Sequence, residues 1–302
     1  MMVTGKGGTG KTTFSAAMGL VSAATGLNTV VCEIDTQRSA LAPIFDCKVE
    51  YQPLVVREKL ALCNLTWREA FTTYLERSLP VTGLVRRILE NEVVNRFLDF
   101  TPGSRELVIL SRIAQLCESY DRVIVDMPAS GHMLSLLGVT RSLQQLFRAG
   151  PVRKRVDEIL SLLLAETSSV AFVALPEEMV VNETLETMEQ LQNRELAGCS
   201  PFVFLNRATL PSLTTDEARL MEWLGSQSLG PDAGEFVRAG LWEKQLEEDT
   251  IESLARLNEA FERGAISVGT ISSGQSHRNV VGEVAAALGR KVGVTKRDLA
   301  WT

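Results

Sequence analysis

Short apolar runs alternate along the chain with longer segments of helical length, and this alternation predicts the fold. An apolar run of roughly four to eight residues between turn residues is typical of a buried strand. The runs that we interpret as strands are 27–34, 122–126, 170–175, 201–205 and 265–271. Strands that alternate with helices favour a mainly parallel sheet with helices on both faces. We therefore expect a three-layer α/β fold.

The longer segments carry helical periodicity. Residues 55–118 are expected to be mostly helical and to form an insertion before the strand at 122–126. The spacing of an amphipathic helix is seen in Val81, Leu84, Val85, Ile88 and Leu89. We interpret 1–302 as one domain with a helical subdomain formed mainly by about 50–118 and 133–165. The apolar segments 81–100 and 133–147 either pack as ordinary core or line a groove for an apolar protein client, and the pattern leaves both open.

Composition and charge narrow the class of protein. The chain has 302 residues, of which 45% are hydrophobic, and 31 basic residues face 37 acidic ones for a net charge of −6. An acidic chain without a basic stripe argues against nucleic-acid binding. No apolar run approaches the roughly 18 residues of a membrane span and no signal peptide is visible, so we expect a cytoplasmic protein without stable membrane insertion.

The cysteines give no sign of a metal centre. No Cys-x-x-Cys pair occurs, and only two histidines are present. We therefore expect neither a disulfide framework nor a zinc or iron–sulfur site. The five cysteines are Cys32, Cys47, Cys63, Cys117 and Cys199.

A glycine-rich stretch near the start of the chain carries the strongest chemical signal. It fits the phosphate-binding loop (P-loop), in which backbone N–H groups surround phosphates, a lysine reaches the β- and γ-phosphates and a hydroxyl ligates Mg²⁺. The following run, 12–23, is expected to be a helix whose N-terminus faces the anion. Only 1–4 precede the loop and make a short first strand, so we expect the natural chain to begin further upstream. The candidate nucleotide-binding residues are Gly5, Lys6, Gly7, Gly8, Thr9, Gly10, Lys11, Thr12 and Thr13.

Polar residues follow several predicted strands at the edge where open α/β sheets build their sites. Asp35 follows the strand 27–34 and acts either on the attacking water or only in a turn. Asp126 ends its strand in the way that supports Mg²⁺ through a water in P-loop proteins. Asn206 follows 201–205 and either caps a turn or contacts adenine. His132 lies in the loop after Asp126, where a switch role and a structural role are both open.

Three motifs in one order resemble the arsenite-transporter ATPase (ArsA) family. They are GKGGTGKTT at 5–13, DMPASGH at 126–132 and VFLN at 203–206. This family includes the ATPase that guides tail-anchored membrane proteins, and it belongs to the deviant P-loop class of MinD, ParA and the nitrogenase iron protein. Lys6, an additional lysine at the start of the loop, marks that class. The resemblance extends over most of the chain and is weakest at 45–100 and 208–264.

The resemblance implies an ATP- and Mg²⁺-dependent homodimer with nucleotides at the facing subunits. Lys6 would reach the partner's phosphates, and Asp35 would orient the water within a first switch at 35–41. Asp126 would serve the Mg²⁺ shell, followed by a second switch at 127–132. Glu177 and Asn206 would contact adenosine.

The chain departs from the family at several positions. The usual Asp-Pro-Ala of the first switch is replaced by Asp-Thr-Gln-Arg at 35–38. The clustered cysteines that bind arsenite in the family, and the pair that holds zinc in its tail-anchor members, are absent. We therefore do not expect stimulation by arsenite.

The sequence supports ATP hydrolysis that couples dimer closure to a client related to membrane proteins or anion transport. One alternative is a positioning ATPase of the MinD/ParA type, although the basic tail 289–302 has only a thin apolar face. Another is a nucleotide-binding scaffold without significant turnover.

Overall fold

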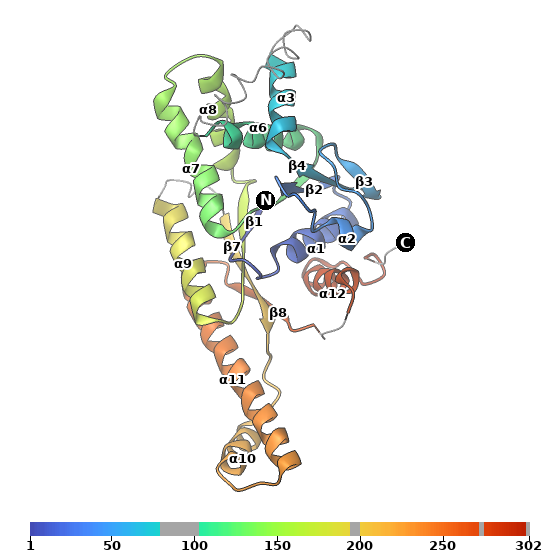
Figure 1. Cartoon of the computed structure of the whole chain (residues 1–302), viewed down its shortest axis with the longest axis vertical. Helices are drawn as coiled ribbons and strands as arrows, with labels where there is room; N and C mark the ends of the chain where they lie inside the picture. Colours follow the sequence, from blue (N-terminus) through green and yellow to red (C-terminus); the bar gives the residue numbers. More distant parts are fainter. Residues whose placement is uncertain (79–102, 194–199, 272–274, 300–302) are drawn as a thin grey trace.

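An eight-stranded sheet forms the centre of the molecule (Figure 1). The structure is a computed structural model that describes residues 1–78, 103–193, 200–271 and 275–299. The strand order is β3-β4-β2-β5-β1-β6-β7-β8, and β3–β4 is the one antiparallel pair among the described strands. The strands are β1 (Met2–Thr4), β2 (Thr29–Ile34), β3 (Leu54–Arg57), β4 (Leu60–Leu65), β5 (Arg122–Asp126), β6 (Ser169–Ala174), β7 (Ser200–Ala208) and β8 (Ala265–Gly269).

Helices cover both faces of the sheet, as the alternation of apolar runs predicted. Successive residues of a strand point to opposite faces, so Val31 of β2 packs in one core cluster and Val30 and Cys32 pack in the other. The first cluster is covered by α1 (Lys11–Ala24), α2 (Ala42–Phe45) and α12 (His277–Gly289). The second is covered by α6 (Ser104–Ser119), α7 (Ser130–Leu146), α8 (Pro151–Leu163) and α9 (Glu178–Asn193). The expected three-layer α/β architecture is therefore confirmed.

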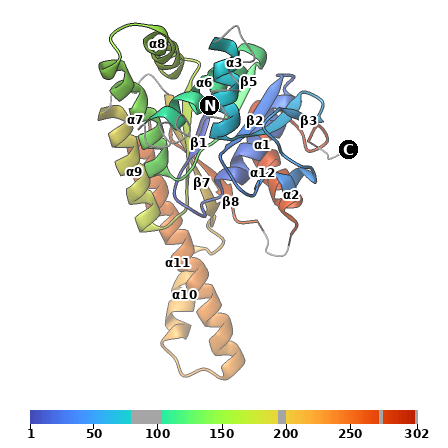
Figure 2. The ribbon, with the colours of Figure 1, turned by 45° about the horizontal axis from the view of Figure 1, so that its top comes forward.

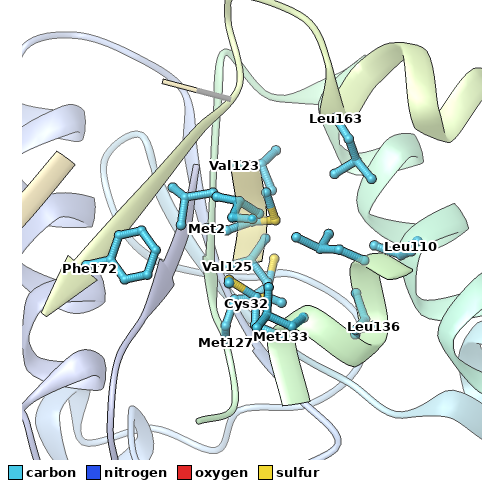
Figure 3. Close-up of a cluster of buried hydrophobic side chains, with 14 of the residues drawn as sticks. Met2, Cys32, Leu110, Val123, Val125, Met127, Met133, Leu136, Leu163 and Phe172 are labelled. Atoms are coloured by element: carbon cyan, nitrogen blue, oxygen red, sulfur yellow. The ribbon is translucent and has the colours of Figure 1, made fainter. Parts of the chain in front are cut away.

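The second cluster joins the sheet to the helices above it. Figure 3 shows Met2, Cys32 and Val125 of the sheet opposite Leu110 of α6 and Leu136 of α7. All five side chains are at most 7% exposed. Strands buried on both faces read as continuous apolar runs, which explains why these runs were recognisable in the sequence.

The segment 54–65 differs from the expectation that 55–118 is mostly helical. It forms the hairpin of β3 and β4 at one edge of the sheet. All six residues of β4 are buried, so the strand lacks the polar alternation that separates a strand from a buried helix in sequence. Helical structure begins at α3 (Trp67–Ser78), and the stripe expected within 81–100 lies outside the described residues.

The apolar segment 133–147 is mostly core. In α7 the side chains of Met133, Leu134, Leu136, Leu137 and Leu143 are all buried. At its end Leu146 is 72% exposed and Phe147 is 37% exposed. Within the described chain, α7 therefore offers only its last turn to a client.

Two helices form an arm that extends away from the sheet (Figures 1 and 2). They are α10 (Thr215–Gly225) and the first half of α11 (Pro231–Ala260), whose second half packs against the sheet. Thr214 caps the start of α10 through a reciprocal capping box with Glu217, which satisfies backbone donors at the helix start. No residue of α10 is buried. Among the described helices, none is long and apolar enough to span a membrane.

Candidate nucleotide-binding site

The P-loop, residues 5–10, connects β1 to α1 at the carboxyl edge of the sheet. Gly5 has φ +147 and Gly10 has φ +100, conformations that side chains rarely adopt. A Cβ at Gly5 would lie 2.2 Å from the carbonyl oxygen of Val173, and one at Gly10 would lie 2.7 Å from Nδ2 of Asn206. Both positions therefore require glycine because of the backbone angle and because of close neighbours.

Hydrogen bonds hold the loop in a defined shape. The carbonyl oxygen of Lys6 accepts from Thr9 Oγ1 and from Lys11 Nζ, each at 3.0 Å. Asn206 Nδ2 donates to the carbonyl oxygen of Thr9 at 2.8 Å. Burial lowers the pKa of Lys11, and the nearby carboxylates of Asp126 and Glu183 oppose this shift. The loop is thus tied to β7 and places a lysine ammonium at its centre.

The two residues expected to serve Mg²⁺ are in direct contact. Thr12 Oγ1 donates to Asp126 Oδ2 at 2.5 Å, and Ser15 Oγ donates to Asp126 Oδ1 at 3.2 Å. Burial raises the pKa of Asp126 to about 6, and these two hydrogen bonds oppose the shift. A hydroxyl and a carboxylate are the hard oxygen donors that Mg²⁺ prefers, together with phosphates and water. The pair fits the ion, while the described chain contains no group of three or more His, Cys, Asp or Glu side chains placed to hold a metal alone.

Two further polar residues lie in register with Asp126 across neighbouring strands. Glu33 of β2 is opposite Asp126 of β5 and also opposite Asn64 of β4. Glu33 Oε1 accepts from the backbone N–H groups of Ala40 at 2.7 Å and Leu41 at 3.1 Å. Sequence reasoning missed both residues. The available signal was an acidic residue inside an otherwise apolar strand.

Asn64 contacts the start of the segment 35–41, and Glu33 holds the end of the same segment. Its Nδ2 donates to the carbonyl oxygen of Thr36 at 2.8 Å, and its Oδ1 accepts from the N–H of Thr36 at 3.3 Å. Asp35 lies just before this contact with φ +47 and an exposed side chain. A left-handed aspartate is uncommon and marks a turn held by its surroundings. Its role toward the attacking water stays a prediction.

Comparison with known proteins decides the family. Residues 1–164 match the model of the anion-transporting ATPase family, ArsA. The chain is 31% identical to ATPase BagA of Mycobacterium tuberculosis (strain ATCC 25618 / H37Rv) over 257 residues, which cover 80% of this chain and 72% of that protein. The chain belongs to the ArsA family of ATPases.

More distant members of the ArsA family match shorter parts of the chain. ATPase ASNA1 homolog 2 of Paramecium tetraurelia is 27% identical over 45% of this chain and 42% of its own length. A putative arsenical pump-driving ATPase of Aquifex aeolicus (strain VF5) is 27% identical over 46% of this chain and 48% of its own length. The resemblance inferred from the three motifs is therefore confirmed, and ATP binding follows from the family.

Lys6 of the P-loop has an ion-pair partner within the same chain. Lys6 Nζ lies 3.7 Å from Glu183 Oε2, and both side chains are about one-third exposed, at 37% and 36%. Glu183 Oε1 also accepts from Ser130 Oγ at 2.5 Å. Glu183 therefore joins the P-loop to the end of the expected second switch. Contact of Lys6 with a partner subunit stays a prediction.

The expected second switch at 127–132 is only partly a loop. Met127 continues the edge of β5 by donating from its N–H to the carbonyl oxygen of Val3 at 2.9 Å. The helix α7 begins at Ser130, so the first helical turn includes His132, whose side chain is exposed. The described loop therefore consists of only a few residues between β5 and α7.

The two residues expected at the adenosine occupy different settings. Glu177 is exposed after β6, and its carbonyl oxygen accepts from the N–H groups of Val180 and Val181 at the start of α9. The side chain of Asn206 is bound to the P-loop, and its Oδ1 accepts from the N–H of Arg207 at 2.9 Å. Adenosine contact by Glu177 and Asn206 stays a prediction.

Two cysteines that are far apart in sequence meet in the core. Cys32 and Cys63 are opposite each other on β2 and β4, with their sulfur atoms 3.3 Å apart. The hydrogen bond between them and their burial raise the pKa of Cys32 well above its usual value. A thiol with a raised pKa and no exposure is a poor nucleophile and metal ligand. The pair therefore fills the core.

Proposed function

We propose that this ArsA-family ATPase hydrolyses ATP in a Mg²⁺-dependent reaction, as a homodimer with facing nucleotide sites, in the cytoplasm. The observation that carries the proposal is the contact between Thr12 and Asp126 beside a P-loop already held in shape. A preorganised site of this kind lowers a barrier by positioning and by charge stabilisation. The homodimer is supported by the family membership.

The residues would divide the work between binding and charge stabilisation. Lys11 and the backbone of the loop bind the phosphates, and Lys11 neutralises charge on the transferred group. Thr12 would hold Mg²⁺ directly and Asp126 would hold it through a water, and the ion would supply further positive charge at the phosphates. Asp35 orients the attacking water, and Lys6 leaves Glu183 to contact the phosphates of the partner subunit.

Phosphate release with and without Mg²⁺ tests this proposal. Lys11→Ala should weaken both nucleotide binding and hydrolysis, whereas Asp35→Asn should reduce hydrolysis and leave most binding intact. Glu186→Gln, an exposed carboxylate of α9, is the matched control. Nucleotide binding without Mg²⁺-dependent turnover by the wild-type protein would instead support a nucleotide-binding scaffold. Equal rates for wild type and Asp35→Asn would remove Asp35 from catalysis.

Base selectivity tests the proposed contacts of Glu177 and Asn206 with adenosine. Asn206→Ala breaks the bond to the P-loop and should weaken binding of every nucleoside triphosphate. If Asn206 also contacts adenine, the same variant should lose preference for ATP over GTP. An unchanged preference would restrict Asn206 to holding the loop. Glu177→Gln, measured in the same way, tests the other residue.

The finer part of the proposal is an apolar protein client whose binding depends on dimer closure. The arm formed by α10 and the first half of α11 carries large exposed apolar side chains that suit an apolar helical segment. Trp223 is 59% exposed, Phe236 is 66% exposed and Trp242 is 69% exposed. Desolvation of the two indoles by such a peptide should shift their fluorescence to shorter wavelength. The double variant Trp223→Phe/Trp242→Phe provides the reference spectrum. Peptide binding without this shift in the wild-type protein would exclude the arm as the binding surface.

A further inference from the structure

We propose that Glu33 is a positioning residue that couples the Mg²⁺ side of the nucleotide site to residues 35–41. The inference rests on the proposed function because it requires Mg²⁺ at Thr12 and Asp126. It assigns Glu33 two tasks, one for each carboxylate oxygen. One oxygen holds the backbone at the end of the segment, and the other accepts a hydrogen bond from a water of the Mg²⁺ shell.

The sheet brings Glu33 to the correct place and orientation. Glu33 and Asp126 are neighbours on parallel strands. Glu33 is two residues from Val31, which packs in the cluster covered by α1. Because side chains two apart on a strand share a face, Glu33 points toward α1, whose N-terminal part carries the Thr12 and Ser15 hydroxyls bonded to Asp126. The negative charge of Glu33 contributes to the raised pKa of Asp126, which supports their proximity.

Only one of the two carboxylate oxygens of Glu33 has hydrogen-bond partners among the described residues. The residue is 1% exposed, and its Oε1 holds two backbone N–H groups. Its Oε2 is buried and has no hydrogen-bond partner among the described residues. An unpaired carboxylate oxygen is costly in a protein interior. A donor supplied by the ligand, such as a Mg²⁺-bound water, would satisfy it.

Asn64 holds the opposite end of the segment 35–41 in place. It forms two hydrogen bonds with Thr36, while Glu33 holds Ala40 and Leu41. The exposed middle, 37–38, is anchored on both sides by residues in register on neighbouring strands. A change at the Mg²⁺ side of Glu33 therefore reaches the backbone of the segment directly.

Glu33→Gln separates this coupling from a merely structural role. The glutamine oxygen can still accept from the two backbone N–H groups, but its amide nitrogen donates and cannot accept from a Mg²⁺-bound water. The affinity for ADP, measured with Mg²⁺ and with EDTA, should fall about tenfold in Mg²⁺ and stay near the wild-type value in EDTA. Glu186→Gln is the control and should match wild type in both.

Hydrogen exchange provides a second test, whose wild-type comparison needs no variant. Amide exchange at 40–41 should slow more with Mg²⁺ and ADP than with ADP and EDTA, and Glu33→Gln should remove this difference. Full Mg²⁺ dependence of ADP binding in a folded Glu33→Gln protein would overturn the inference. The inference would also be overturned if amide exchange at 40–41 of the wild-type protein did not change with Mg²⁺ although ADP binding did. Wild-type ADP binding without any Mg²⁺ dependence would instead contradict the proposed function.

Discussion

Asp126 should make the nucleotide-free protein less stable at neutral pH than at mildly acidic pH. Burial raises its pKa from 3.8 to about 6. As pH rises from about 4 to 6, the unfolded chain releases this proton while the folded chain retains it, so stability falls. Above pH 6 both states are ionised, and the loss levels off. A shift of about two pKa units corresponds to about 3 kcal/mol in total.

The substitution Asp126→Asn tests this reasoning because the amide stays neutral at every pH. The linkage relation predicts that the variant gains about 1.4 kcal/mol relative to wild type between pH 5 and pH 7.5. Urea unfolding in EDTA, followed by circular dichroism across this range, measures the gain. The control is Glu186→Gln. A stability difference between Asp126→Asn and wild type that is constant with pH would refute the reasoning.

The same variant should lose Mg²⁺-dependent function while its stability relative to wild type rises with pH. The amide that replaces Asp126 cannot supply a carboxylate to the Mg²⁺ shell, so Mg²⁺ should no longer tighten ADP binding. Such opposition between stability and activity is expected where a site stores unfavourable burial of charge. A stabilised variant with unchanged Mg²⁺ dependence would show that Asp126 does not serve the ion.

Three further predictions concern the P-loop, an ion pair and the thiols. Gly10→Ala should lower the free energy of unfolding by about 1–3 kcal/mol because residue 10 has a positive φ. Gly7→Ala, where a Cβ would meet no atom within 4 Å, should lower the stability less. Equal losses of stability in thermal melts of the two variants would contradict this prediction. Glu183→Gln removes a partly exposed ion pair and should change the unfolding free energy by less than about 1 kcal/mol; a larger loss in urea titrations would mean that more than the ion pair is lost. Exposed Cys117 should react with a thiol reagent faster than buried Cys32, so Cys117→Ala should remove a rapid phase that Cys32→Ala retains. Loss of that phase in Cys32→Ala would contradict the burial.

Five parallel strands of the sheet could be predicted because each is a short apolar run between turn residues. The predicted strands at 122–126 and 170–175 correspond closely to β5 and β6, and the helix at 12–23 corresponds to α1. The apolar run Leu60–Leu65 shows where such inference fails. A fully buried strand and a buried helical segment have the same composition and no distinguishing period. The sequence of the antiparallel hairpin at the edge was therefore interpreted as helical.

One part of the candidate site is marked by local sequence motifs, and the other part depends on contacts between residues that are distant in the sequence. The P-loop and Asp126 belong to local motifs, so the sequence could predict them as candidates. Glu33, Asn64 and Glu183 contact residues brought close by strand register or helix packing, and no local pattern records those contacts. The protrusion of the arm also depends on tertiary packing.

Mixing two inactive variants tests the shared dimeric site most directly. Lys6→Ala and Asp35→Asn should each lose hydrolysis alone. If Lys6 acts on the partner's phosphates, a mixed dimer has one site with an intact Asp35 and an intact Lys6 from the opposite subunit. Random pairing on addition of ATP to an equimolar mixture should then restore about a quarter of wild-type phosphate release. Failure of the mixture to exceed either variant alone, with mixed dimers demonstrated, would contradict a site shared between subunits.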